Sequence, residues 1–173
     1  AQATSIVIFG ASGDLTRRKL IPSLCSLFGQ GRLGPEVQIG GVARSNLSVQ
    51  EFRDSLIKGM EAFESFRSDP WEWAEFASRI PYCRGDVSSP GDPKGLEETL
   101  RSVEFPGKPA NRLYYLALVP FLCGPAILSL GSMGMAREED CWRRVVIEKP
   151  FGFDLASAKE LNKLVHTVFA ESQ

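Results

Sequence analysis

A strand, a glycine turn and a helix follow one another in the first twenty residues and constrain the fold more than any other feature. Residues 5–9 (SIVIF) are apolar and β-branched, which is typical of a buried strand. Gly10 and Gly13 then interrupt the pattern, and helical spacing follows from Leu15. Glycine permits a sharp turn and close approach of a ligand, and a helix N-terminus offers free N–H groups and partial positive charge. The segment therefore predicts a phosphate-binding turn of a dinucleotide site.

The same turn also has a purely structural interpretation. The dinucleotide fingerprint is G-x-G-x-x-G, whereas here Gly10 and Gly13 stand on either side of Ala11 and Ser12. A glycine turn between a strand and a helix also occurs where no ligand binds. Three cations follow at 17–19 (RRK), in a part of the helix where acidic residues are normally favoured. They favour a bound anion, with a solvated basic face as the alternative.

Composition bounds the class of protein. The 173 residues suffice for one domain with a substantial core. The net charge of −1 gives no basic field, so nucleic-acid binding is not expected. No run approaches the roughly 18 apolar residues of a membrane span, and no signal-peptide pattern opens the sequence. We therefore expect no membrane partner and a cytoplasmic location, with an organelle such as a plastid as the alternative.

Cysteine and histidine usage narrows the chemistry. The 4 cysteines are widely spaced and lack metal-ligand spacing, which predicts reduced thiols and no metal site. His166, on a late helix, is the 1 histidine of the chain and the one imidazole candidate for acid or base chemistry.

Strands and helices alternate along the chain. Apolar runs predict further strands at 37–42, 80–84, 112–119 and 142–148. Helices are expected at 15–30, 48–66, 71–77, 96–103, 126–133 and 154–169, with loops at 85–95 and 105–110. Pro22 should kink the first helix or split off its first turn, and Pro125 suits the first position of its helix. This order predicts a single α/β domain, a Rossmann-like doubly wound parallel sheet with helices on both faces.

In such a sheet the ligand lies outside the carboxyl ends of the strands, and informative residues stand there. Arg44 follows the second strand, where an NAD site has an acidic residue and an arginine suits a 2′-phosphate. Lys149 follows the fifth strand and offers a compact charge for a substrate hydroxyl or phosphate beside the nicotinamide. Each also has a plainer interpretation as an exposed cation. In the same turn, Glu148 is expected to pair with a cation or cap a backbone group, and a cis bond before Pro150 is an option.

Four motifs and their order resemble glucose-6-phosphate dehydrogenase. They are 10–15 (GASGDL), 42–45 (VARS), 111–118 (NRLYYLAL) and 146–152 (VIEKPFG). The resemblance runs along almost the whole chain and covers the N-terminal, coenzyme-binding half of the family. It implies the coenzyme-binding portion of an enzyme that transfers hydride from C1 of glucose 6-phosphate to NADP. The product would be 6-phosphogluconolactone, in the first step of the oxidative pentose phosphate pathway.

The resemblance implies NADP as the coenzyme and assigns it a set of residues. The implied cofactor-binding residues are Gly10, Ala11, Ser12, Gly13, Asp14, Leu15, Thr16, Arg17, Arg44 and Lys149. Residues 10–17 would lie on the coenzyme phosphates, with Asp14 structural at the helix start, and Arg44 would bind the 2′-phosphate. Lys149 would contact both the coenzyme and glucose 6-phosphate. The full-length enzyme would be a homo-oligomer.

Two departures from the family pattern qualify these expectations. After the fourth strand the family usually has Pro-Pro and then an aromatic near the coenzyme, whereas residues 119–123 read VPFLC, with Phe121 as the candidate substitute. The family's catalytic motif, RIDHYLGK, is expected beyond Gln173, and His166 does not match it. The catalytic histidine and the large β+α substrate domain would then be absent from this chain. We expect the isolated chain to bind NADP weakly or not at all and not to turn over.

Two other functions remain open from the sequence. Another family of sugar oxidoreductases also pairs a Rossmann domain with a Glu-Lys-Pro turn, although it usually carries a plainer G-x-G-x-x-G. A non-enzymatic, regulatory NADP-binding module would also suit a short chain that lacks a catalytic base.

Overall fold

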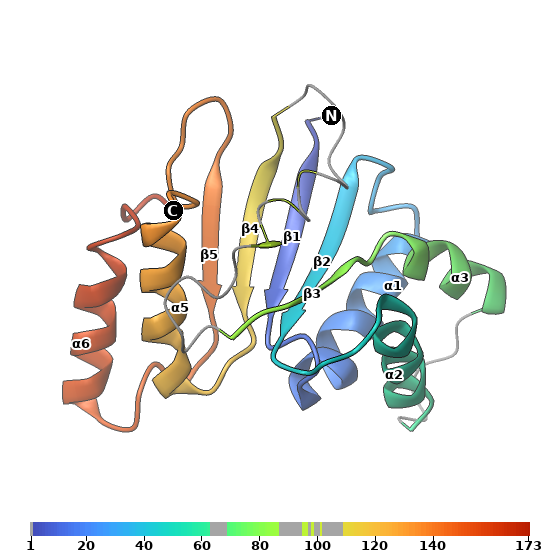
Figure 1. The fold of residues 1–173 in the computed structure, drawn as a ribbon, viewed down its shortest axis with the longest axis horizontal. Coiled ribbons are helices and arrows are strands. Elements are labelled where there is room, and N and C mark those ends of the chain that lie inside the picture. The colour runs from blue at the N-terminus through green and yellow to red at the C-terminus, as the bar shows by residue number, and fades with distance from the viewer. Residues whose placement is uncertain (1, 63–68, 87–94, 97, 99–100, 102–108) are drawn as a thin grey trace.

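The computed structural model describes residues 2–62, 69–86, 95–96, 98, 101 and 109–173. The strands of this part of the chain form one 5-stranded sheet. They are β1 (Thr4–Phe9), β2 (Val37–Ala43), β3 (Tyr82–Arg84), β4 (Asn111–Leu116) and β5 (Arg143–Ile147). The order is β3-β2-β1-β4-β5 and every pairing is parallel (Figure 1). Because β1 is central and the chain winds outward in both directions, the predicted doubly wound α/β sheet is confirmed.

Helices cover both faces of the sheet (Figure 1). Those of one face are α1 (Ile21–Gly29), α2 (Val49–Glu61) and α3 (Pro70–Ser78). Those of the other face are α5 (Pro120–Ser132) and α6 (Leu155–Val165). In β1, Ile8 joins the core beneath the first group, while Val7 and Phe9 join the core beneath the second. Successive side chains of this strand are therefore buried on opposite faces, as a central parallel strand requires.

Capping boxes begin two of the described helices. Ser48 Oγ accepts a hydrogen bond of 3.2 Å from the Glu51 N–H, and Glu51 Oε2 accepts one of 2.7 Å from the Ser48 N–H. This is the capping box expected from the sequence. Asp154 caps α6 in the same way with Ser157. Because these carboxylates accept backbone N–H bonds, the pKa of Glu51 and that of Asp154 are lowered.

Of the predictions made for Pro22 and Pro125, one is confirmed and one is wrong. A π-helical turn, η1 (Thr16–Leu20), precedes α1, with Pro22 in the first turn of α1, so the predicted split of this helix is confirmed. The prediction that a helix begins with Pro125 is wrong, because α5 begins at Pro120 and contains Pro125. Pro120 already supplies the favoured first position. Buried residues at helical spacing carry the helix through Pro125; they are Cys123, Ala126, Ile127 and Leu130.

Some boundaries differ from the predictions. β4 ends at Leu116 and α6 ends at Val165, both earlier than the apolar patterns suggested. The end of the helix predicted at 48–66, and most of the helix at 96–103 and of the loops at 85–95 and 105–110, lie outside the described residues.

No helix in the described ranges is long and apolar enough to cross a membrane. In the same ranges, no group of three His, Cys, Asp or Glu side chains is arranged to hold a metal ion. All four cysteines are free, and Cys25, Cys123 and Cys141 are buried. Burial, with a smaller effect from Glu72, raises the pKa of Cys25 to about 12, so its thiol stays protonated at neutral pH.

Candidate functional site

A cleft of about 490 Å³ opens at the carboxyl edge of the sheet, the lower edge in Figure 1. The described residues that line it are Gly10, Ser12, Gly13, Ala43, Arg44, Ser45, Gly85, Ala117, Leu118, Val119 and Leu122. One wall is polar and comes from the glycine turn and the tip of β2, whereas the other is aliphatic and comes from the segment after β4. This size and mixed lining are typical of a small-molecule or cofactor site, and the position is that of ligands in open α/β sheets.

Gly10 makes the turn after β1 possible. Its φ is +80°, and a Cβ at this position would lie 2.2 Å from the Ala117 carbonyl oxygen. Only glycine satisfies both the backbone angle and this close approach without a shift of the chain. The turn is thereby packed directly against the segment that leaves β4, and these two segments form adjacent walls of the cleft.

The N–H groups of the turn are divided between the fold and the cleft. The N–H groups of Gly10 and Ala11 both donate to the Val42 carbonyl, at 2.9 and 3.1 Å, and that of Gly13 donates to the Gly10 carbonyl at 2.9 Å. These three therefore serve the fold, contrary to the expectation that the amides of the turn are free for phosphate. The Ser12 N–H forms no hydrogen bond within the described residues. Available donors begin there and continue into the helix, whose first N–H groups lack intrahelical partners.

Two of the predicted phosphate-binding residues lie behind the cleft. Ala11 and Thr16 are both fully buried. The Thr16 hydroxyl donates to the Gly10 carbonyl at 3.1 Å. The Thr16 side chain therefore supports the turn from inside the protein, and its hydroxyl does not face a ligand.

The remaining residues of the predicted 10–17 segment lie outside the cleft lining. Asp14 forms an exposed ion pair of 3.2 Å with Arg18, one helical turn later, consistent with a structural role at the helix start. The aliphatic part of Arg17 lies against α2, where a Cβ on Gly59 would be 2.8 Å from Arg17 Cβ. Leu15 is half-buried. The structure thus brings Gly10, Ser12, Gly13 and Arg44 together and places the rest of the set around them.

The loop that carries Arg44 is held by β3 through three consecutive carbonyl groups. The Tyr82 hydroxyl lies 2.6 Å from the Ser45 carbonyl oxygen and 3.2 Å from that of Ala43. The Gly85 N–H donates to Ala43 at 2.9 Å, and Arg84 Nε donates to the Arg44 carbonyl at 3.3 Å. Burial raises the pKa of Tyr82, so its hydroxyl remains a donor. The backbone of Arg44 is fixed, while its side chain is exposed at the cleft rim.

A serine pair links this loop to the glycine turn. Ser45 Oγ donates to Ser12 Oγ at 3.2 Å, although the two residues are 33 positions apart. Neither this pair nor the aliphatic wall formed by Leu118 and Leu122 was predicted from the sequence. The position of Ser45 next to Arg44 was the one sequence signal for the serine pair. The aliphatic wall could not be predicted, because it depends on the path of the chain after β4.

At the tip of β5, Lys149 is exposed and does not line the cleft. It lies at the same edge of the sheet, and the Lys149–Pro150 bond is cis. The sequence predicts that Glu148 pairs with a cation or caps a backbone group. The structure differs, because Glu148 accepts a hydrogen bond from the Tyr115 hydroxyl. Burial, together with this carboxylate, raises the pKa of Tyr115 to about 12. The Lys149 turn is thereby tied to β4.

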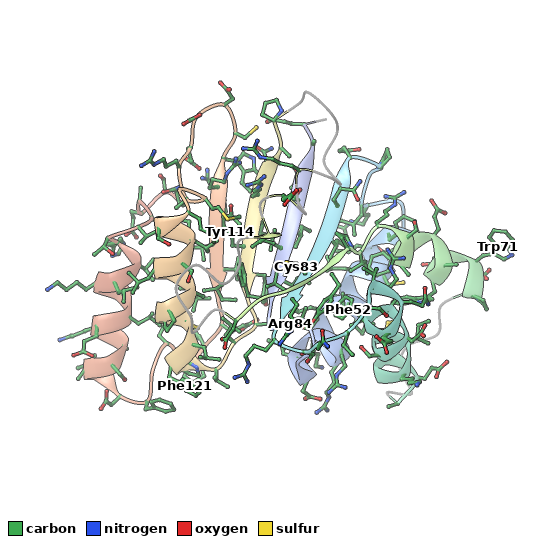
Figure 2. All side chains as sticks on the ribbon, in the orientation of Figure 1. Phe52, Trp71, Cys83, Arg84, Tyr114 and Phe121 are labelled. Carbon is green, nitrogen blue, oxygen red and sulfur yellow. The ribbon has the colours of Figure 1, made fainter. Side chains whose placement is uncertain are left out.

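Phe121, the candidate aromatic after β4, is not among the residues described as lining this cleft. Phe121 is 67% exposed and lines a separate groove of about 260 Å³ with Phe151 and Phe153, at the start of α5 and α6. Figure 2 shows it at the lower end of α5, away from Arg84. Because Pro120 is already the first residue of a helix, the side chain that follows is turned away from the cleft, and Val119 and Leu122 form the wall instead.

Comparison with known proteins supports the same interpretation. A family model described as glucose-6-phosphate dehydrogenase, NAD binding domain, matches residues 7–173. The chain belongs to this family. It is therefore a dinucleotide-binding domain, and the resemblance inferred from the four motifs is confirmed.

The relatives show how much of a longer protein the domain matches. Glucose-6-phosphate 1-dehydrogenase of Bacillus subtilis is 38% identical over 169 residues, which is 97% of this chain and 33% of the relative. That of Aggregatibacter actinomycetemcomitans is 36% identical over 174 residues, 100% of this chain and 35% of the relative. The chain thus spans about a third of the length of these relatives.

Solved structures agree with the fold. A glucose-6-phosphate dehydrogenase in complex with its substrate glucose-6-phosphate superposes with a TM-score of 0.83 at 34% identity, over 98% of this chain and 35% of the other. The enzyme of Mycobacterium avium gives the same TM-score of 0.83 at 30% identity, over 98% of this chain and 35% of the other.

Proposed function

We propose that the chain binds NADP and is the coenzyme-binding portion of a glucose-6-phosphate dehydrogenase. The observation that carries this proposal is the common cleft. The glycine turn after β1 and Arg44 at the tip of β2 line one cavity, with the serine pair between them. A pyrophosphate against the N–H groups from Ser12 onward would leave the ribose end of the coenzyme near Arg44.

The choice of NADP over NAD rests on the charge at the tip of β2. A site for an unphosphorylated ribose has a carboxylate there, whereas Arg44 follows this strand, and none of the described residues that line the cleft is acidic. A guanidinium stays charged and forms paired hydrogen bonds with phosphate oxygens. Arg44 therefore favours the phosphorylated ribose and offers no acceptor for ribose hydroxyls.

For the whole protein we propose hydride transfer from C1 of glucose 6-phosphate to NADP, giving 6-phosphogluconolactone in the oxidative pentose phosphate pathway. The bound coenzyme would supply the hydride acceptor. This chain would hold the coenzyme phosphates and, through Lys149, place a positive charge beside the substrate. A general base must take the O1 proton, and the part of the cleft lining that the structure describes contains neither a histidine nor a carboxylic acid.

That base and the β+α substrate domain would come from the other two thirds of the protein, which we propose to be a cytoplasmic homo-oligomer. The isolated chain is accordingly expected not to oxidise glucose 6-phosphate. Reduction of NADP by the chain alone, followed at the absorbance of the reduced nicotinamide, would contradict this part of the proposal.

Equilibrium titration of the chain with NADPH and NADH tests the binding proposal. We expect tighter binding of NADPH, and we expect Arg44→Ala to weaken NADPH roughly tenfold with little effect on NADH, since one charge-assisted contact is lost. Arg32→Ala is the matched control, because Arg32 is an exposed arginine before the start of β2, at the opposite edge of the sheet. Equal affinity of the wild-type chain for both dinucleotides would refute the assignment of NADP.

A further inference from the structure

Arg84 is a second cation at the loop of Arg44, and no sequence motif identified it. It ends β3, where the strand register pairs it with Ala43 of β2. Its Nε donates to the Arg44 carbonyl at 3.3 Å. Figure 2 shows Arg84 at the carboxyl tips of the strands, the edge at which the cleft opens. The Arg84 guanidinium therefore lies against the backbone of Arg44, beside the described cleft lining that includes Arg44 but not Arg84 itself.

The charges at this place are unbalanced. Across the described ranges, neither Arg44 nor Arg84 forms an ion pair with a carboxylate. Both side chains are exposed, and two adjacent cations repel each other. Two cations with no carboxylate partner among the described residues attract an anion, and a dianionic ligand would offset the repulsion.

The hydrogen bond of Arg84 leaves most of its donors available. Nε–H donates to the Arg44 carbonyl, and the two terminal nitrogens, with four N–H groups, form no hydrogen bond to any residue that the structure describes. A phosphate monoester has three acceptor oxygens and carries nearly two negative charges at neutral pH, so it can accept from two guanidinium groups at once.

We propose that Arg84 is a specificity-determining residue that binds the 2′-phosphate of NADP together with Arg44. Bracing of the loop alone would not require a charge, because the Tyr82 hydroxyl and the Gly85 N–H already hold the carbonyls of Ala43 and Ser45. The inference rests on the proposed function, and it adds β3 to the elements that recognise the phosphorylated ribose.

Dissociation constants of NADPH and NADH, measured at fixed ionic strength, test the proposal. Arg84→Ala is expected to weaken NADPH roughly three- to tenfold, the range for a partly solvated charge-assisted contact, and to leave NADH within about twofold. Arg84→Lys keeps the charge and should retain most of the NADPH affinity. Arg84→Gln keeps a donor for the Arg44 carbonyl without the charge and should behave like Arg84→Ala. Arg32→Ala is the control for loss of one exposed positive charge.

The outcomes separate this inference from the proposed function. If Arg84→Ala matches Arg32→Ala while Arg44→Ala still loses NADPH affinity, the role of Arg84 is refuted and the proposed function stands. Equal weakening of both dinucleotides, rescued by Arg84→Gln, means that Arg84 only braces the loop, which also refutes it. A wild-type chain that binds neither dinucleotide overturns both. Circular dichroism of each variant checks folding, and the Lys and Gln variants decide the matter if Arg84→Ala does not fold.

Discussion

At the carboxyl edge of the sheet, the tips of β1, β2 and β3 differ from those of β4 and β5 in hydrogen bonding and in burial. On the side of β1, β2 and β3, backbone carbonyls and small side chains are joined by short hydrogen bonds, and the aromatic rings beneath them are buried. Phe52 is fully buried and stacks on Tyr82 with ring centroids 4.5 Å apart. On the side of β4 and β5, the tip carries an exposed lysine and large exposed apolar residues. Phe121, Phe153 and Leu155 are 67%, 79% and 71% exposed.

This difference separates what the chain can do alone from what it cannot. The loop of Arg44 is positioned by β3 and by Ser12, all within the described residues, so the choice of dinucleotide is built into this domain. The aromatic rings at the start of α5 and α6 are largely exposed and add little to the hydrophobic core. Such exposure is typical of a surface that contacts another domain or protein. Whatever NADP affinity the isolated chain has should therefore keep its preference for the phosphorylated ribose, whereas substrate turnover should be absent.

The largest expected difference is in the stability lost when one aromatic ring is removed from each side, Phe52 on the β2 side and Phe153 on the β5 side. Phe52→Ala removes a fully buried ring from between Tyr82 and Gly41, and should lower the free energy of unfolding by about 3–5 kcal/mol. Phe153→Ala removes an exposed ring and should change it by no more than about 0.5 kcal/mol. Urea unfolding followed by circular dichroism measures both. Similar losses in the two variants would mean that the β5 tip is as integral to the domain as the β2 side.

A second contrast uses two glycines with similar backbone angles. Gly10 has φ +80° and Gly31 has φ +68°, but only at Gly10 would a Cβ meet the chain, 2.2 Å from the Ala117 carbonyl oxygen. Gly31→Ala should cost about 1–2 kcal/mol of stability, from the left-handed angle alone. Gly10→Ala should cost roughly 2–4 kcal/mol, because the segment after β4 must shift as well, and should also weaken NADPH. Equal costs would show that the turn and this segment are not tightly coupled.

The sequence was sufficient for features that depend on local signals. Alternating apolar segments predicted the strands, the Ser48 capping box predicted the start of α2, and the position of Arg44 after a strand predicted its place at the cleft. Features that depend on register could not be obtained in this way. The pairs Ser12–Ser45 and Tyr115–Glu148 join residues 33 positions apart, and their contacts exist only because particular strands are neighbours. The helix start predicted at Pro125 was wrong, because burial along one face of α5 outweighs the loss of the hydrogen bond that proline cannot donate.

The phosphate turn shows a subtler limit. Residues 10–17 read as one phosphate-binding unit, yet the N–H groups of Gly10, Ala11 and Gly13 and the Thr16 hydroxyl are used within the fold. A tight turn must satisfy its own backbone before it can offer donors to a ligand. The sequence therefore located the turn, and only the structure shows which of its groups are available to a ligand.

The smallest contrast compares one tyrosine hydroxyl from each side. Tyr82→Phe removes the donor to the Ala43 and Ser45 carbonyls and should cost about 1 kcal/mol of stability. It should also raise the Kd of NADPH about twofold, since about half of that stability loss would fall on the loop of Arg44. Tyr115→Phe removes the donor to Glu148 and should cost a similar amount of stability, about 1 kcal/mol, while NADPH affinity stays unchanged. Weaker NADPH binding in Tyr115→Phe would show that the two sides are coupled.

The pH dependence of stability provides a further test of the hydrogen bond between Tyr115 and Glu148. Burial and the hydrogen bond to Glu148 raise the pKa of Tyr115 from 10.0 to about 12, so the folded state holds the phenol proton more tightly than the unfolded chain. The stabilisation from this proton is complete below pH 10 and is lost as the pH rises towards 12. The stability advantage of the wild-type chain over Tyr115→Phe should therefore be constant up to about pH 9 and shrink above it. An advantage that grows with pH above 10 would mean that the phenol ionises more readily in the folded state, and that Glu148 is not its acceptor.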